Sequence, residues 1–265
     1  MLLAFDLDGT VVTHQNEIPS RILKAVAKAK DAGHIITVLT GRPKASALEA
    51  VHKLGAEHLY AVNHGAVVIG ENDTVLSRSL INEEDVRTII GRYGLNEGLE
   101  YAFMIDDDIF VNRPEDPRWS WAHTLNRNVL PFSEDAVQDA DKIILSADEE
   151  GPRVYSELRR AHPEMMNYLW PDGFLEITGV GADKGTALAF ICRELGVAQK
   201  DTIAFGDGVN DVTMMQWAGR AVAVGTAHPD VLTESDEHIA EPEQNGVADW
   251  LAENLLAARV WEAKV

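Results

Sequence analysis

The sequence is poor in cysteine and in positive charge. The first shortage excludes internal disulfides, and the second argues against polyanionic partners. Cys192 is the one cysteine in 265 residues, so no disulfide can form within the chain. Lys and Arg number 23 against 43 Asp and Glu, which gives a formal net charge of −20 at pH 7. Nucleic acids and anionic membrane surfaces bind through clustered Lys and Arg. The charge balance therefore argues against both as partners.

The sequence also lacks a long hydrophobic run. No apolar stretch approaches the roughly 18–20 residues that cross a bilayer. The first ten residues, MLLAFDLDGT, contain no Lys or Arg and reach an acidic residue at Asp6, which is untypical of a signal peptide. We expect a cytoplasmic protein with no membrane partner, present as a monomer or a homodimer.

Apolar residues make up 46% of the chain and charged residues 25%, as is usual for a folded globular protein. Short apolar runs at 2–5, 35–39 and 59–62 alternate with helical spacing at 20–32 and 48–54. The alternation returns late in the chain, with expected helices over 184–195 and 245–256 and expected strands at 203–205 and 221–224. Strands that alternate with helices predict a parallel sheet covered by helices.

The middle of the chain has a different pattern. Residues 101–112 look like two strands joined by an Asp-rich turn, further strands are expected at 142–147 and 174–178, and helical spacing is found at 83–92 and 152–161. We therefore predict an α/β core in two parts, residues 1–81 and 179–265, with an α+β cap inserted between them at residues 82–178.

The strongest motif is Asp6-Leu7-Asp8-Gly9-Thr10, which directly follows the first apolar run. In an open parallel sheet, ligands bind beyond the carboxyl ends of the strands, and Asp6 lies at such an end. Gly9 permits the tight turn that lets both carboxylates face one ligand. An acidic turn after a strand is the alternative, but the apolar strand before the motif favours a functional interpretation.

A second acidic motif, Gly206-Asp207-Gly208-Val209-Asn210-Asp211, follows the run at 203–205. Its two carboxylates and one amide offer the hard oxygen ligands that Mg²⁺ takes together with waters and a substrate phosphate. Helix capping is the alternative for any one of these residues. The presence of all three beside the first motif favours a Mg²⁺ site.

Two further motifs contain groups that bind anions. Thr40-Gly41-Arg42 offers a hydroxyl and backbone amides before a helix, although helix capping explains this tripeptide equally well. In Gly181-Ala182-Asp183-Lys184-Gly185-Thr186, a lysine begins a helix. If the lysine is exposed, its interaction with the helix dipole is unfavourable by about 0.3–1 kcal/mol. A residue that breaks a local rule points to function, with a solvated lysine as the alternative.

These four motifs and their order resemble the haloacid dehalogenase-like superfamily of phosphohydrolases. The insertion between Arg42 and Lys184 resembles the Cof-type branch with its type IIB cap, as do Asn63-His64-Gly65-Ala66 and Asp172-Gly173-Phe174-Leu175-Glu176-Ile177. The resemblance spans the whole chain and implies a Rossmann-like parallel-sheet core with an inserted α+β cap. His64 departs from that branch, which more often has Asn before the glycine.

The resemblance also implies a reaction. Asp6 attacks phosphorus and forms an aspartyl-phosphate, and Asp8 protonates the leaving oxygen and then deprotonates the attacking water. Mg²⁺ is held by the Asp6 and Asp207 carboxylates and the Asp8 carbonyl oxygen. The remaining expected roles are phosphate binding by Thr40, Gly41, Lys184 and Asn210, support by Asp211 and Thr10, and substrate contact by Arg42 and Asn63.

The expected substrate is a small phosphorylated metabolite such as a sugar phosphate. A phosphomutase of the same superfamily would use the same residues. A non-enzymatic phospho-acceptor domain is disfavoured because such a domain is shorter and needs no insertion. Candidate pocket residues in the cap are the aromatic Trp119, Trp121 and Trp170 and the polar Arg113 and His123, although a Trp side chain more often packs in a core. We interpret residues 106–108, all Asp, as a hairpin turn rather than a second metal site.

Overall fold

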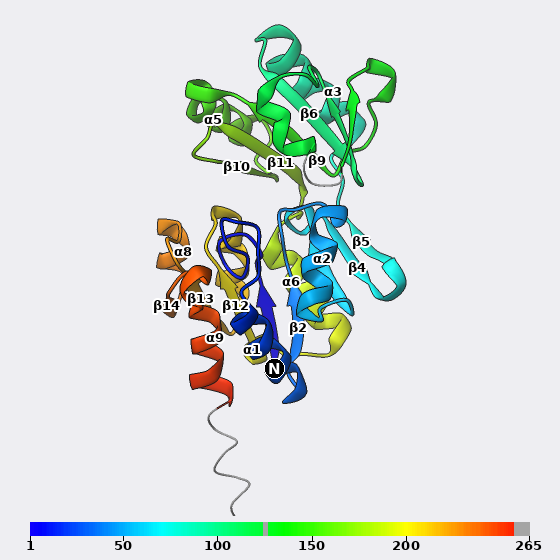
Figure 1. Cartoon of the computed structure of the whole chain (residues 1–265). Coiled ribbons are helices and arrows are strands. Elements are labelled where there is room, and N and C mark those ends of the chain that lie inside the picture. The colour runs from blue at the N-terminus through cyan, green and yellow to red at the C-terminus, as the bar shows by residue number, and fades with distance from the viewer. Residues whose placement is uncertain (124–126, 257–265) are drawn as a thin grey trace, which may run out of the picture.

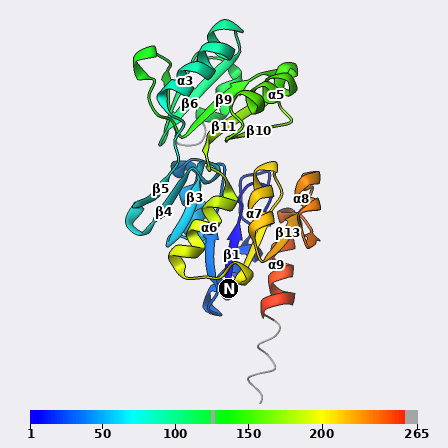
Figure 2. The ribbon, with the colours of Figure 1, turned by 180° about the vertical axis from the view of Figure 1, so that it is seen from behind.

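The computed structural model describes residues 1–123 and 127–256. The chain forms two lobes, and two short stretches of chain connect them (Figures 1 and 2). We call the lobe with the five-stranded sheet the core and the lobe with the six-stranded sheet the cap. Within the described residues, no helix is both long and apolar enough to cross a membrane.

The core is built on a sheet in the order β14-β13-β12-β1-β2, and every pair of neighbours runs parallel. Its strands are β1 (Leu2–Phe5), β2 (Ile35–Val38), β12 (Thr202–Gly206), β13 (Arg220–Val224) and β14 (Glu237–Ile239). β1 and β12 are buried along their whole length, as apolar strands covered on both faces should be. The predicted α/β fold with a parallel sheet is confirmed.

Alternate residues of β1 face opposite layers of helices. Leu3 and Phe5 pack with α1 (Ser20–Asp31), α2 (Lys44–Leu54) and α9 (Gly246–Leu251). Leu2 and Ala4 pack with α6 (Lys184–Leu195) and α7 (Val212–Trp217). Figures 1 and 2 show these two layers from opposite sides. The short helix α8 (Pro229–Thr233) follows β13, and α9 continues as a π-helical turn over Ala252–Leu256.

The third apolar run, at residues 59–62, meets the core sheet through a parallel bridge, as expected, but its main pairing is with an antiparallel sheet that was not expected. β3 (Leu59–Val62) meets the core sheet at a bridge between Leu39 and Ala61. It pairs antiparallel with β4 (Val67–Gly70), which pairs antiparallel with β5 (Val75–Arg78). The chain reverses because residues 63–65 all have positive φ. The sequence patterns did not predict β4 or β5.

The cap sheet has the order β10-β11-β9-β6-β7-β8, and its neighbours are antiparallel except for the parallel pair β7–β8. Its strands are β6 (Glu100–Ile105), β7 (Asp108–Val111), β8 (Asn128–Pro131), β9 (Lys142–Ser146), β10 (Met165–Leu169) and β11 (Phe174–Val180). Its helices are α3 (Glu83–Ile89), which continues as a π-helix over Ile90–Asn96, α4 (Ser120–His123) and α5 (Gly151–Ala161). The sequence patterns did not predict β8, β10 or α4.

The two faces of the cap sheet have different surroundings. Ile143, Leu175 and Ile177 pack in the cluster that contains residues of α3 and α5. On the other face, Ile144 and Phe174 line a cavity shared with the core. β11 therefore directs alternate side chains toward the core before the chain returns to α6.

Candidate active site

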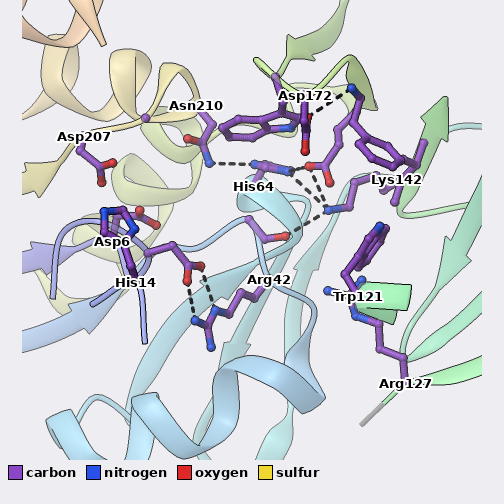
Figure 3. Close-up of a pocket in the computed structure, with 17 residues that line it drawn as sticks. Asp6, His14, Arg42, His64, Trp121, Arg127, Lys142, Asp172, Asp207 and Asn210 are labelled. Atoms are coloured by element: carbon purple, nitrogen blue, oxygen red, sulfur yellow. Dashed lines mark hydrogen bonds and ion pairs between the residues drawn. The ribbon is translucent and has the colours of Figure 1, made fainter. Parts of the chain in front are cut away.

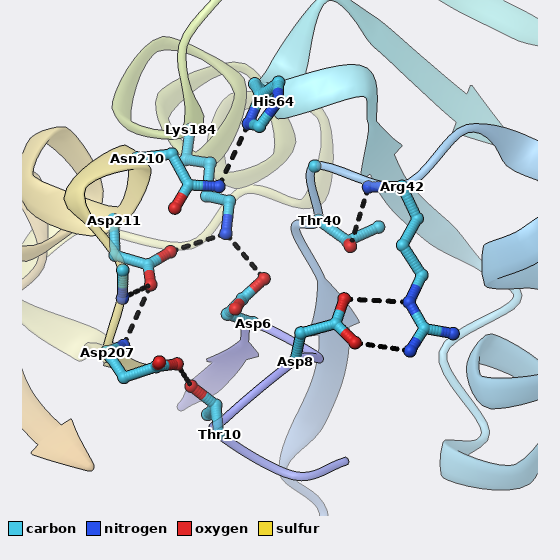
Figure 4. Close-up of polar contacts among 12 residues, drawn as sticks. Asp6, Asp8, Thr10, Thr40, Arg42, His64, Lys184, Asp207, Asn210 and Asp211 are labelled. Carbon is cyan, nitrogen blue, oxygen red and sulfur yellow. Dashed lines mark hydrogen bonds and ion pairs between the residues drawn. The ribbon is translucent and has the colours of Figure 1, made fainter. Parts of the chain in front are cut away.

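Three parallel strands of the core end at the same edge, and the expected site residues follow them directly. Asp6 comes after β1, Asp207 after β12, and Thr40 two residues after β2. Figure 4 shows these side chains converging with Lys184, the first residue of α6. Parallel pairing in register brings the strand ends together, so segments far apart in sequence meet here.

Lys184 lies at the centre of the site and is fully buried. Its Nζ lies 2.6 Å from Oδ1 of Asp6 and 2.5 Å from Oδ1 of Asp211. Burial lowers the pKa of a lysine, but the two carboxylates outweigh that effect and raise the pKa of Lys184 above its usual value. The ammonium group is therefore charged, and the alternative of a solvated lysine is excluded.

The acidic residues around Lys184 form a compact cluster. One carboxylate oxygen from each of Asp6, Asp207 and Asp211 lies within 4.8 Å of the other two. Burial raises the pKa of Asp6 well above its usual value, and Asp211 and Asp207 add to the effect against the opposing charge of Lys184. Burial and the neighbouring Asp211 raise the pKa of Asp207 to about 7. The cluster has more negative charge than its lysine compensates.

Hydrogen bonds leave selected oxygens of this cluster available. Both oxygens of Asp211 are engaged, because Oδ1 meets Lys184 and Oδ2 accepts from the backbone N–H groups of Asp207 and Gly208 at 2.9 and 2.8 Å. Oδ1 of Asp207 accepts from the Thr10 hydroxyl at 2.7 Å. Oδ2 of Asp6 and Oδ2 of Asp207 accept no hydrogen bond from any described residue. Asp6 and Asp207 each therefore keep one oxygen for a cation.

Gly9 is required for this arrangement. Its φ of +78° lies in the left-handed region, and a Cβ atom placed there would lie 2.3 Å from Oδ2 of Asp207. Any side chain at this position would push Asp207 away from Thr10 or strain the turn. The glycine of the first motif thus lets the second motif approach.

Asp8 is held by Arg42 at the edge of the site (Figure 4). The Arg42 guanidinium donates from Nε to Oδ2 of Asp8 at 2.8 Å and from Nη2 to Oδ1 at 2.5 Å. Arg42 also donates to Asn16 and to the carbonyl oxygen of Ser46. This bidentate pair fixes the orientation of the Asp8 carboxylate.

The loop after β2 presents a free backbone donor. The Thr40 N–H donates to Ala61, and the Thr40 hydroxyl accepts from the Arg42 N–H at 3.1 Å. The Gly41 N–H, by contrast, has no acceptor among the described residues. A Cβ atom at Gly41 would lie 2.5 Å from Cε1 of His64, so the close approach of His64 demands glycine there.

A cavity of about 600 Å³ lies between these strand ends and the cap (Figure 3). Asp6, Asp8, Arg42, Asp207 and Asn210 line its core side. Residues that line it from the cap are Trp121, Arg127, Lys142, Ile144, Trp170, Asp172, Phe174 and Glu176. The cavity therefore joins the charged strand ends to a cap surface that combines aromatic and charged side chains.

A buried polar cluster connects the two lobes beside the cavity. His64 of the core pairs with Glu176 of the cap, whose carboxylate lies 3.2 Å from Nζ of Lys142. Nδ1 of His64 lies 3.0 Å from the amide of Asn210. Burial, and then the charge of Lys142, lower the pKa of His64 to about 4. Although burial opposes it, the charges of Lys142 and His64 hold the pKa of Glu176 well below its usual range.

The structure brings most of the expected site residues together, but not all of them. Asn63 is buried and does not line the cavity, whereas its neighbour His64 does. Of the cap candidates, Trp121 and Trp170 line the cavity and Trp119 is buried in the cap core. Arg113 pairs with Glu100, and His123 contacts the carbonyl oxygen of Pro114.

The Asp-rich turn between β6 and β7 has contacts that the sequence did not indicate. Asp106 has a φ of 54° and pairs with Arg78 at 3.0 Å. Asp107 accepts a hydrogen bond from the backbone N–H of Ala45 at the start of α2, at 2.9 Å. The turn is therefore a contact between cap and core.

Sequence reasoning missed Lys142, Arg127 and His14 as cavity residues. Glu176 lies in a motif that carried the resemblance, and its alternation with Leu175 and Ile177 in an apolar strand could have marked it as facing the core. Lys142 begins an otherwise apolar strand, KIILS, and a lysine inside such a run is the one signal that the sequence offered for it.

Comparison with known proteins agrees with this geometry. The sequence model of the haloacid dehalogenase-like hydrolase family matches residues 3–251. The 5-amino-6-(5-phospho-D-ribitylamino)uracil phosphatase YitU of Bacillus subtilis is 29% identical over 262 residues, which cover 95% of this chain and 96% of that protein. The HMP-PP phosphatase of Escherichia coli is 26% identical over 243 residues, covering 88% of this chain and 87% of that protein.

Solved structures show the same architecture. The subclass IIB sugar phosphatase BT4131 superimposes with a TM-score of 0.83 at 27% identity, over 95% of this chain and 98% of that chain. The match of the family model over nearly the whole chain, together with these relatives, confirms the expected type of enzyme, a phosphoric monoester hydrolase of the Cof type. The chain belongs to the haloacid dehalogenase-like hydrolase family.

Proposed function

We propose that this protein is a Mg²⁺-dependent phosphatase that hydrolyses a small phosphorylated metabolite through an aspartyl-phosphate on Asp6. The observation that carries the proposal is the buried cluster of Asp6, Asp207 and Asp211 around one lysine at the carboxyl ends of the core strands. The names of the relatives support the phosphatase class, since YitU and the HMP-PP enzyme are both phosphatases.

The donor set fits a hard divalent cation. Hydrolases of this family generally use a divalent metal, and Mg²⁺ prefers carboxylate and carbonyl oxygens. The raised pKa values of Asp6 and Asp207 report uncompensated negative charge, which a cation would relieve. The ion would be held by the free oxygens of Asp6 and Asp207 and by the carbonyl oxygen of Asp8. When bound, Mg²⁺ supplies positive charge between the nucleophile and the phosphate.

Asp6 is positioned to act as the nucleophile. Lys184 holds Oδ1 of Asp6 at 2.6 Å, so the side chain cannot rotate freely. With Oδ2 left to the cation, Oδ1 would form the new bond to phosphorus while the bond from phosphorus to the leaving oxygen breaks. Lys184 also keeps a positive charge beside the carboxylate, which favours the ionised form that attack requires.

Asp8 is positioned to act as the general acid and base. Its carboxyl group lines the cavity beside Asp6 and is more exposed than that of Asp6, so it can reach the leaving oxygen on the cavity side. It would give its proton to that oxygen and later take a proton from the water that attacks the aspartyl-phosphate. Arg42 orients the ionised carboxylate through its two hydrogen bonds, so the acid step requires one of these oxygens to leave Arg42 and bear the proton.

The phosphoryl group would be bound by one free backbone donor and by two side chains that their neighbours hold in place. The Gly41 N–H has no acceptor among the described residues and belongs to a loop that lines the cavity. Asn210 lines the cavity, with its amide oriented by His64. Lys184 compensates the charge that develops on the phosphoryl oxygens, and Asp211 holds Lys184 in place.

Residues 82–178 would act as the cap that selects the substrate. The cavity of about 600 Å³ is of a size that encloses a small ligand. The overall charge of −20 repels a polyanion before it reaches the site. We therefore expect phosphorylated small metabolites to be substrates, and not polynucleotides or phosphoproteins.

The test is release of inorganic phosphate from a panel of phosphorylated sugars, nucleotides and vitamins and from an aryl phosphate, with Mg²⁺ present. We expect release from the aryl phosphate and from a subset of the metabolites. Interconversion of positional isomers without net phosphate release would instead establish a phosphomutase. The absence of both reactions across the panel would refute the proposal.

A further inference from the structure

The cavity is lined by three Arg or Lys side chains from the described residues, and they differ in their partners. Arg42 pairs with Asp8, and Lys142 pairs with Glu176. Arg127 forms no ion pair with any described residue, and its Nε is buried without a hydrogen-bond partner there. One cation of the cavity is therefore left without a counter-charge.

Arg127 is held in place by an aromatic ring. Its Cζ lies 4.7 Å from the centre of the Trp121 ring, and Trp121 in turn packs edge-on against Phe174, with the ring centres 6.3 Å apart. Stacking occupies a face of the guanidinium group and leaves its N–H edge available for an acceptor. The arrangement fixes an arginine without using up its hydrogen-bond donors.

The charge on Arg127 is energetically unfavourable in the structure as it stands. Burial lowers the pKa of Arg127 to about 10, and the nearby Arg42 adds to that effect against the attraction of Glu176 and Asp107. The group is still protonated at neutral pH. A partly buried cation with an unsatisfied N–H is stabilised by an anion that supplies both charge and an acceptor.

The position of Arg127 decides which part of a substrate it can meet. Figure 3 places Arg127 and Trp121 on the cap side of the cavity, across from Asp6 and Asp207. The transferring phosphoryl group would lie at the strand ends beside Asp6, where Lys184 already compensates its charge. The apolar side chains Ile144, Phe174 and Trp170 line the cavity from the cap. A group bound by Arg127 therefore belongs to the leaving group.

We propose that Arg127 binds a second anionic group, a carboxylate or a phosphate, on the leaving group of the substrate. The preferred substrates are then phosphate esters that have two separate anionic groups joined by a short uncharged skeleton. The proposal rests on the phosphatase function proposed above and makes Arg127 a determinant of specificity within it.

The test compares kcat/KM for three esters with Mg²⁺ present. Glucose 6-phosphate has an uncharged leaving group, 6-phosphogluconate adds a carboxylate, and fructose 1,6-bisphosphate adds a phosphate. The specificity ratio is kcat/KM for a charged ester divided by kcat/KM for glucose 6-phosphate. Arg127→Gln should lower this ratio by about tenfold or more. Arg127→Lys keeps the charge without the planar fork and should lose less. A loss confined to one charged ester identifies the anion that Arg127 binds.

The chain offers a matched control. Arg159 also lies over an aromatic ring of the cap, 5.8 Å from the centre of Tyr155, but does not line the cavity. Arg159→Gln should keep the wild-type ratios. An unchanged ratio in Arg127→Gln would overturn the proposal. An equal loss for all three esters would also overturn it, because Arg127 would then act on the transferring phosphoryl group.

Binding separates this proposal from the proposed function. In the Asp6→Asn chain, calorimetry with 6-phosphogluconate, fructose 1,6-bisphosphate and glucose 6-phosphate measures affinity without turnover. Adding Arg127→Gln should weaken binding of at least one charged ester about tenfold more than binding of glucose 6-phosphate. Equal effects on all three esters would refute the role of Arg127. Failure of the wild-type protein to hydrolyse any ester would refute the phosphatase function. The binding comparison would then still test whether Arg127 binds the second anionic group.

Discussion

Lys142 of the cap donates a hydrogen bond to the carbonyl oxygen of Gly41 in the core, over 3.1 Å. The same ammonium group lies 3.2 Å from Glu176 and 3.4 Å from Nε2 of His64. Lys142 is almost completely buried, and burial lowers its pKa despite the attraction of Glu176. The cap therefore contacts the backbone of the proposed phosphate-binding loop through a buried charge.

Removal of Lys142 and removal of Glu176 should each destabilise the protein, and the two effects should not add. Lys142→Met leaves Glu176 without its cation, and an uncompensated buried charge costs about 3–5 kcal/mol. Glu176→Gln should also destabilise the protein, because Lys142 then loses its carboxylate. The double variant should be less destabilised than the sum of the two single changes, since no unpaired charge remains.

Urea unfolding of the wild type, the two single variants and the double variant measures the interaction energy between Lys142 and Glu176. The kinetic readout is phosphate release, which should fall in Lys142→Met because the Gly41 loop loses a hydrogen bond. Additive free energies of unfolding would show that Lys142 and Glu176 do not interact in solution.

Asp6→Asn should abolish turnover while the fold remains intact. The amide is a poor nucleophile, so phosphate release should fall by about a thousandfold or more. The free energy of unfolding should not decrease, because burial and neighbouring carboxylates already raise the pKa of Asp6 and the variant removes that unfavourable charge. Asp8→Asn should also stop turnover, whereas Asp31→Asn, at the exposed end of α1, should not. Retention of a tenth of wild-type activity by Asp6→Asn would contradict the covalent mechanism.

Activity should depend on a divalent metal. EDTA should remove phosphate release and Mg²⁺ should restore it, while Ca²⁺ should restore little because its coordination is larger and more flexible. Mg²⁺ should also raise the melting temperature of the wild type, since it binds the folded carboxylate cluster. Asp207→Asn should lose most of that rise. Thr10→Val removes the hydroxyl that orients Asp207 and should weaken Mg²⁺ binding about 10–100-fold. Full activity in metal-free buffer would refute the metal site.

Much of the core could be predicted because buried parallel strands are continuous apolar runs. β1 and β12 have that form, and the acidic motifs directly after them mark the edge where ligands bind. β5 could not be found in this way, because Val75 and Leu76 are 50% and 44% exposed. The reversal after β3 depends on positive φ values at Asn63 and His64, which no apolar pattern reveals.

The residues that the cap contributes to the site could not be predicted from the sequence, for a different reason. Lys142 and Glu176 lie on neighbouring strands, and the register between β9 and β11 brings their charged groups within 3.2 Å of each other. Arg127 reaches the cavity from the residue before β8. Motif spacing locates residues at the ends of parallel strands, whereas these three depend on how the cap sheet is paired and placed over the core.

His64 should make the stability of the protein depend on pH. Its pKa is lowered from about 6.5 to about 4, first by burial and then by the charge of Lys142. Above pH 6.5 the imidazole is neutral in both the folded and the unfolded state. Between pH 6.5 and 4 the unfolded state binds a proton that the folded state does not. The free energy of unfolding should therefore decrease as the pH falls through this window, by about 1.4 kcal/mol per pH unit.

His64→Asn tests this prediction with little change in the backbone, because asparagine tolerates the φ of 59° at this position. Urea unfolding at pH 7.5, 6.5, 5.5 and 4.5 should show a decrease in the wild type that is about 2–3 kcal/mol larger than in the variant between pH 6.5 and 4.5. The carboxylates that do not contact His64 titrate alike in both proteins, so their contribution cancels in the difference between the two curves. His58→Asn is the control, since His58 is exposed and lies beside Glu71 on the surface, and it should follow the wild-type curve. Parallel curves for the wild type and His64→Asn would show that His64 is not held neutral between the lobes.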